Sequence, residues 1–92
     1  MAIPRIKLLK LEHDRLISHM FELKSMIRSL ETEAEGLEAM ADAYTDKEYR
    51  AKREEFLFGI GVCRDDLICA KKRLDEIDEM IRAESGGSSA AV

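Results

Sequence analysis

The chain has 92 residues, of which 37% are charged, and it contains one proline, three phenylalanines, two tyrosines and no tryptophan. A chain this short forms one domain at most, and this composition is typical of long helices or coiled coils rather than of a sheet protein. The net charge of −4 argues against nucleic acid as a partner, because binding to phosphates requires clustered lysine and arginine. We therefore expect an all-α protein whose core is thin or shared with another chain.

Helix one is predicted over about residues 4–43. Pro4 suits the first helical position, where its missing amide would have no intrahelical partner. Residues spaced alternately three and four apart then follow without interruption, which places them on one stripe of a helix. That stripe consists of Ile6, Leu9, His13, Leu16, Met20, Leu23, Ile27, Leu30, Ala34, Leu37, Ala41 and Tyr44. A helix that ends at Gly36 is the alternative, but the stripe keeps its phase beyond Gly36 and favours a continuous helix.

Helix two is predicted over about residues 46–84, after a turn at 44–45. Thr45 and Glu48 have the spacing of a capping box, in which the two residues satisfy each other's backbone amides at a helix start. The stripe of this helix consists of Tyr49, Arg53, Phe56, Ile60, Cys63, Leu67, Ala70, Leu74, Ile77 and Ile81. The Gly- and Ser-rich segment 85–92 has little apolar surface to offset the entropy of ordering, so we expect a flexible tail.

Two long helices joined by so short a turn must run antiparallel. The predicted fold is a long antiparallel two-helix hairpin, a coiled coil, over residues 1–84. Residues whose numbers sum to about 90 should then face each other. Arg53 lies on the stripe opposite Leu37, and we expect its stem to cover the core while its head points outward.

Several apolar residues lie off the two stripes and would be exposed on an isolated hairpin. They are Ile17, Phe21, Met26, Leu57, Phe58, Val62, Ile68 and Cys69. An exposed apolar surface of this kind indicates an interface, and a homodimer that forms a four-helix bundle is its simplest cover. A different helical partner or a higher oligomer is the alternative. Gly59 and Gly61 indicate either a kink or close packing against a second hairpin, and we favour a continuous helix with close packing.

The sequence shows no catalytic, cofactor or metal constellation, and we expect no enzyme activity and no small-molecule substrate. His13 and His19 are six residues apart and do not share a helical face, as a helical metal pair would. Cys63 and Cys69 point to different faces of one helix, so we expect reduced thiols. No apolar run has the length of a membrane span, and we expect a cytoplasmic protein.

The tip of the hairpin is a second candidate for partner binding, through Asp42, Tyr44, Asp46 and Glu48. Together with the opening Met-Ala-Ile-Pro, Asp42 and the segment 48–54 resemble the amino-terminal coiled-coil hairpin of Gre-type transcript-cleavage factors. The resemblance implies a hairpin that enters the polymerase secondary channel and an acidic tip that holds catalytic magnesium. It covers the tip and one turn, and Thr45 occupies the place of the second acidic residue.

The sequence therefore predicts a non-enzymatic protein–protein interaction module of the adaptor, chaperone, inhibitor or scaffold type. It would act as an oligomer of helical hairpins. The alternative is a small regulator of transcription or RNA. Such a regulator would act through the tip or through a basic strip formed by Arg64, Lys71, Lys72 and Arg73.

Overall fold

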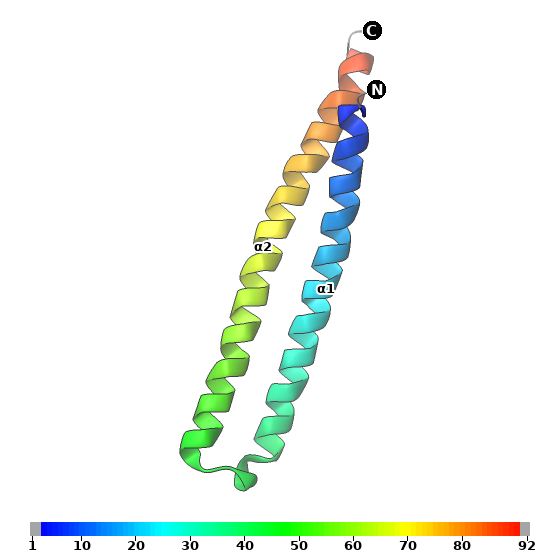
Figure 1. Cartoon of the computed structure of the whole chain (residues 1–92). Helices are drawn as coiled ribbons and strands as arrows, with labels where there is room; N and C mark the ends of the chain where they lie inside the picture. The colour runs from blue at the N-terminus through cyan, green and yellow to red at the C-terminus, as the bar shows by residue number, and fades with distance from the viewer. Residues whose placement is uncertain (1–2, 91–92) are drawn as a thin grey trace. The chain divides into compact units, whose positions relative to one another are not determined.

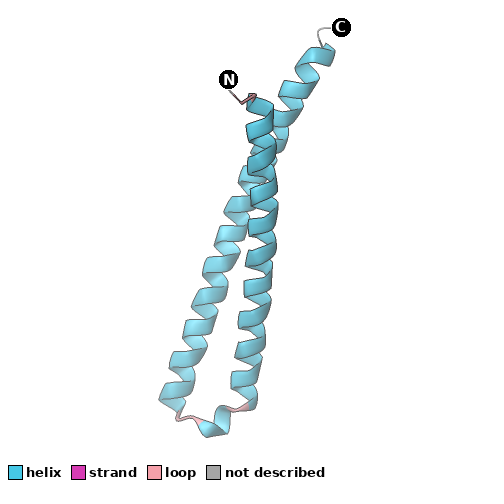
Figure 2. Ribbon diagram, turned by 45° about the vertical axis from the view of Figure 1, so that its right-hand side comes forward, coloured by secondary structure: helices cyan, strands magenta, loops and turns pink. Residues whose placement is uncertain are grey.

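The computed structural model describes residues 3–90, with side chains over 3–86. Two long helices, α1 (Arg5–Ala39) and α2 (Asp46–Ala90), are joined through a short 3-10 helix, η1 (Ala41–Ala43). No strand occurs in this part of the chain, as Figure 2 shows. The prediction of an all-α helical hairpin is confirmed.

The end of α1 differs from its predicted position. The helix ends at Ala39 rather than near residue 43, and its last turn tightens into η1. There the amide of Ala43 donates to the carbonyl of Met40 at 2.9 Å, and the amide of Tyr44 donates to that of Ala41 at 3.2 Å. These i to i−3 bonds are those of a 3-10 helix. Gly36 lies within α1 and is not a left-handed cap, since no described glycine has a positive φ.

The start of α2 is a capping box, as predicted. The amide of Glu48 donates to Thr45 Oγ1 at 3.2 Å, and the amide of Thr45 donates to Glu48 Oε2 at 3.2 Å. Two amides that lack intrahelical partners are thereby satisfied, and the helix begins at Asp46.

The end of α2 also differs from its predicted position, because the helix runs to Ala90 instead of ending at 84. Residues 82–86 are all exposed, so this extension adds nothing to the core there. Helical backbone bonds continue past the last stripe residue, which the apolar pattern could not indicate. Residues 91 and 92 lie outside the described residues, and the flexibility of the tail stays a prediction.

The hairpin divides into two compact units. The terminal unit holds the segment up to Phe21 and the segment from Ile68, and the tip unit holds Glu22–Leu67. In each unit a segment of α1 lies beside a segment of α2 (Figure 1). Buried apolar residues of the terminal unit are Leu9, Ala70, Leu74 and Ile77, and those of the tip unit are Leu23, Leu37, Ile60 and Cys63. Each unit therefore has its own thin core between the two helices.

The two predicted stripes account for nearly all of this burial. Every stripe residue of helix one, from Ile6 to Tyr44, is buried or half-buried. In α2 the same holds for every stripe residue except Arg53, which is exposed. An outward head is what the sequence predicts for Arg53, because a long side chain can cover apolar neighbours and still reach water.

Gly59 fits closely against the opposite helix of the tip unit. A β-carbon built at this position would lie 3.2 Å from Cδ1 of Leu30, whereas at Gly61 nothing lies within 4 Å. Helix α2 continues through both glycines, which confirms the continuous helix. The close packing at Gly59 involves the protein's own α1, so the expectation that it serves a second hairpin is wrong for Gly59.

Candidate interaction surfaces

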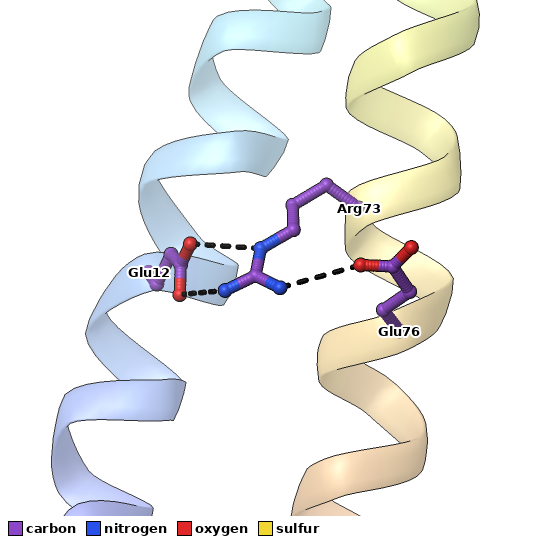
Figure 3. Close-up of polar contacts among 3 residues, drawn as sticks. All are labelled: Glu12, Arg73 and Glu76. Atoms are coloured by element: carbon purple, nitrogen blue, oxygen red, sulfur yellow. Dashed lines mark hydrogen bonds and ion pairs between the residues drawn. The ribbon is translucent and has the colours of Figure 1, made fainter.

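Interhelical ion pairs define the two flanks of the helix pair. In the terminal unit, Arg73 donates from Nε to Glu12 Oε1 at 3.1 Å and from Nη2 to Glu12 Oε2 at 3.2 Å (Figure 3). Glu12 and Arg73 each lie one residue before a stripe residue. In the tip unit, Arg64 Nη2 donates to Glu31 Oε1 at 3.0 Å, and each of these residues follows a stripe residue. We call the line along which the two stripes meet the seam. The two pairs thus lie on opposite flanks of the seam.

The hydrogen bonds of Arg73 and Lys71 stabilise their charged forms. Hydrogen bonds to Glu12 and then to Glu76, which lies 3.3 Å from Nη1, raise the pKa of Arg73. The pKa of Lys71 is raised chiefly by its hydrogen bond to Asp75, which is 2.9 Å long. With Arg64 bound to Glu31, three cations of the predicted basic strip already have carboxylate partners.

His13 lies on the stripe of the terminal unit, between carboxylates. Its Nε2 is 3.1 Å from Oδ1 of Asp78 on α2, and its Nδ1 is 3.6 Å from Oδ1 of Asp14. The contact with Asp78, like that between Arg5 and Glu84 at 3.7 Å, joins residues at the predicted register. His13 therefore acts as a polar tie between the helices of this unit.

All eight residues predicted for the oligomer interface are exposed. In the terminal unit these are Ile17, Phe21, Ile68 and Cys69, and in the tip unit Met26, Leu57, Phe58 and Val62. The phenyl rings stand out farthest, with Phe21 75% exposed and Phe58 74% exposed. The hairpin by itself leaves these side chains without cover, and their role as an interface stays a prediction.

These residues do not all lie on one flank. Phe21 and Ile17 each follow a stripe residue and are neighbours one turn apart on α1. Cys69 precedes the stripe residue Ala70 and lies one turn before Arg73, which places it on the flank of the pair between Arg73 and Glu12. Phe21 and Cys69 are level along the helices, but on opposite flanks.

The predicted interface included only residues from the middle of the hairpin, and it omitted other exposed apolar residues. Leu8 is 50% exposed and Leu11 48% exposed, both near the start of α1, and Ile3 and Met40 are each 57% exposed. The signal that identified the predicted interface, an apolar residue that lies off the stripe, could have identified these residues too.

Two of the four predicted tip residues make contacts within the hairpin, and the other two are exposed. Glu48 caps α2, and Tyr44 is half-buried with Lys52 Nζ 5.5 Å from the centre of its ring, a cation–π contact. Asp42 lies in η1 and Asp46 opens α2, both exposed. Within residues 3–90, no three histidine, cysteine, aspartate or glutamate side chains gather so as to hold a metal ion.

Two shallow hollows lie in the tip unit. One, of about 290 Å³, is lined by Glu33, Gly36, Leu37, Met40, Tyr44, Lys52 and Phe56. The other, of about 330 Å³, is lined by Glu38, Tyr49, Arg50, Arg53 and Glu54. Both are open and lined by charges of each sign, which lie beside several apolar residues in the first hollow and beside Tyr49 in the second.

No protein-family model matches this chain, nor does any curated protein or solved structure. Among the described residues, neither helix includes a stretch with the length and apolar character needed to cross a membrane.

Proposed function

We propose that this protein is a non-enzymatic protein–protein interaction module that acts as an oligomer of helical hairpins. The observation that carries the proposal is the exposure of the eight outer apolar side chains, above all the rings of Phe21 and Phe58. Removing one such side chain from water is worth about 1.5–3 kcal/mol, so a hairpin that covers both rings gains substantially. Large exposed apolar side chains that gather on the surface of a small protein are typical of a binding site.

The proposed first partner is a second copy of the chain, in a four-helix arrangement. We place this oligomer in the cytoplasm, where the free thiols of Cys63 and Cys69 would stay reduced. Binding of a further protein, as in an adaptor or scaffold, would use the surfaces that the oligomer leaves open. A regulator of transcription or RNA is not favoured, because Glu48 and most of the basic strip are already paired within the chain.

The experiment is the solution mass by light scattering for wild type and for the double variant Phe21→Glu with Phe58→Glu. We expect a dimer for wild type and a folded monomer for the variant, with helix content checked by circular dichroism. The matched control is Ile3→Glu with Met40→Glu, which alters two exposed apolar residues outside the predicted interface and should remain dimeric. A monomeric wild type would contradict self-association.

A further inference from the structure

The smaller hollow of the tip unit, of about 290 Å³, is lined on α1 by four residues in a pattern known from coiled coils. The second, third and fourth of these residues follow the first by three, four and seven positions. Four residues so spaced form a diamond on the helix surface, the hole that receives one side chain of a packed helix. They are Glu33, Gly36, Leu37 and Met40, and the other wall consists of Tyr44, Lys52 and Phe56. We call this site the tip hollow.

Gly36 keeps the tip hollow open. It is exposed and lies inside α1, where glycine is a poor helix former. A β-carbon built at Gly36 would meet nothing within 4 Å, whereas one built at Gly59 would lie 3.2 Å from Leu30. The packing of the hairpin itself therefore accounts for the glycine at 59 but not for the glycine at 36. Close approach of another molecule to the backbone is a further reason for a glycine in a helix.

The walls of the tip hollow combine exposed apolar surface with one charge of each sign. Met40 is 57% exposed, and its flexible thioether side chain can adapt to the shape of a partner. Among the side chains described over 3–86, neither Glu33 nor Lys52 takes part in an ion pair. Lys52 lies over the ring of Tyr44 instead. An acid and a base beside an apolar hollow favour a partner with the complementary charges.

We infer that the tip hollow receives one apolar side chain of a partner helix, which places a cation beside Glu33 and an anion beside Lys52. The diamond on α1 fits a helical partner, since helices pack by inserting single side chains into such holes. At the predicted register Lys52 is level with residue 38, so Gly36 lies between the levels of the two charges. The inference goes beyond the proposed oligomer, because none of the lining residues belongs to the predicted oligomer interface.

The probe for the test is an alanine-based helical peptide with a central phenylalanine, a lysine four residues before it and a glutamate four residues after it. A second peptide has the two charges exchanged, because a partner helix can run in either direction. The methyl resonance of Met40 reports occupancy in protein labelled at its methionine methyl groups. We expect one peptide to shift this resonance and to leave that of Met80, in the terminal unit, unchanged. Replacing the central phenylalanine by alanine should weaken binding at least about tenfold, because the ring is no longer buried.

Gly36→Leu fills the tip hollow with a side chain of the protein itself and should also weaken binding at least about tenfold. Leucine is the better helix former, so a loss of helix cannot explain this result. Gly86→Leu is the matched control and should bind as wild type does, since Gly86 is exposed, lies outside the hollow and has nothing within 4 Å of a built β-carbon. Glu33→Lys should weaken the preferred peptide and favour one in which glutamate replaces the lysine.

The inference is overturned if neither peptide shifts the Met40 resonance at concentrations up to about 1 mM. It is likewise overturned if Gly36→Leu binds as tightly as Gly86→Leu. Light scattering separates these results from the proposed function, because a monomeric wild type that binds the peptide would contradict self-association and leave the tip hollow intact. If Gly36→Leu converts a dimeric wild type into a monomer, the hollow holds a second copy of the chain, and the inference of a different partner fails.

Discussion

The terminal unit and the tip unit bury similar apolar stripes but differ in the polar contacts between their helices. In the terminal unit, Arg5, Glu12 and His13 of α1 each have a charged partner on α2. In the tip unit, over the described side chains, one ion pair joins the helices, and the open flanks contain the two hollows. The terminal unit is thus tied at its edges as well as along its centre. The tip unit depends more on its core and on the capping box.

The largest effect on stability should come from substitutions in the cores, which are similar in the two units. Ile77→Ala in the terminal unit and Leu37→Ala in the tip unit should each lower the free energy of unfolding by about 2–5 kcal/mol, because each leaves a cavity. Ile77 has 0% exposure and Leu37 has 6%, so we expect the larger loss at Ile77. Urea denaturation followed by circular dichroism measures both.

The control for this pair is Ile3→Ala, at a side chain that is 57% exposed. Its cost should be small. Hydrogen exchange would show whether each core variant loosens its own unit first, and a loss at Ile77 no greater than at Ile3 would refute the assignment of the core.

A smaller effect is expected at the start of α2, on which the tip unit depends. Thr45→Ala removes the hydroxyl that accepts from the amide of Glu48, and should cost about 0.5–2 kcal/mol. Thr32→Ala is the matched control, since the Thr32 hydroxyl donates to the Arg28 carbonyl inside α1 and alanine is the better helix former. Thermal unfolding of both variants measures the difference. Equal losses would mean that the capping box does not stabilise the hairpin.

The smallest effect concerns the pair between Lys71 and Asp75, which supports α2 in the terminal unit without joining it to α1. Because the folded pKa of Lys71 is raised above the ordinary 10.5, its stabilisation is fully present below that pH and is lost as the pH rises through the raised value. The difference in thermal midpoint between wild type and Lys71→Gln should therefore be constant from neutral pH up to about 10 and should shrink above it. A difference that stays the same above pH 10 would contradict a stabilising role for this pair.

The hydrophobic pattern predicted which residues are buried between the helices, because burial repeats with the helix period and does not depend on the backbone hydrogen-bond pattern. For the same reason the pattern could not predict where the helices end. Ala41 and Tyr44 stay half-buried and in phase although α1 has already become a 3-10 turn, and residues 85–90 are helical without belonging to the stripe. Turn chemistry located one boundary well, because Thr45 and Glu48 act locally.

The predicted register identified some of the ion pairs but not all of them. Arg5 and Glu84, whose numbers sum to 89, lie at that register. Glu31 and Arg64, whose numbers sum to 95, pair outside it. Long side chains can reach acceptors a turn or more away, so several pairings satisfy one pattern of charge. For the candidate surfaces, the pattern predicted which residues the hairpin leaves exposed, and their positions before or after a stripe residue place them on different flanks.

The contact between Gly59 and Leu30 also links two positions that are far apart in the sequence. The branched side chain of Leu30 occupies the space that a methyl group at position 59 would need. A larger residue at 59 would be tolerated best together with a smaller one at 30. In related hairpins these two positions should therefore change in concert, while Gly61, which faces open space, should vary independently of residue 30.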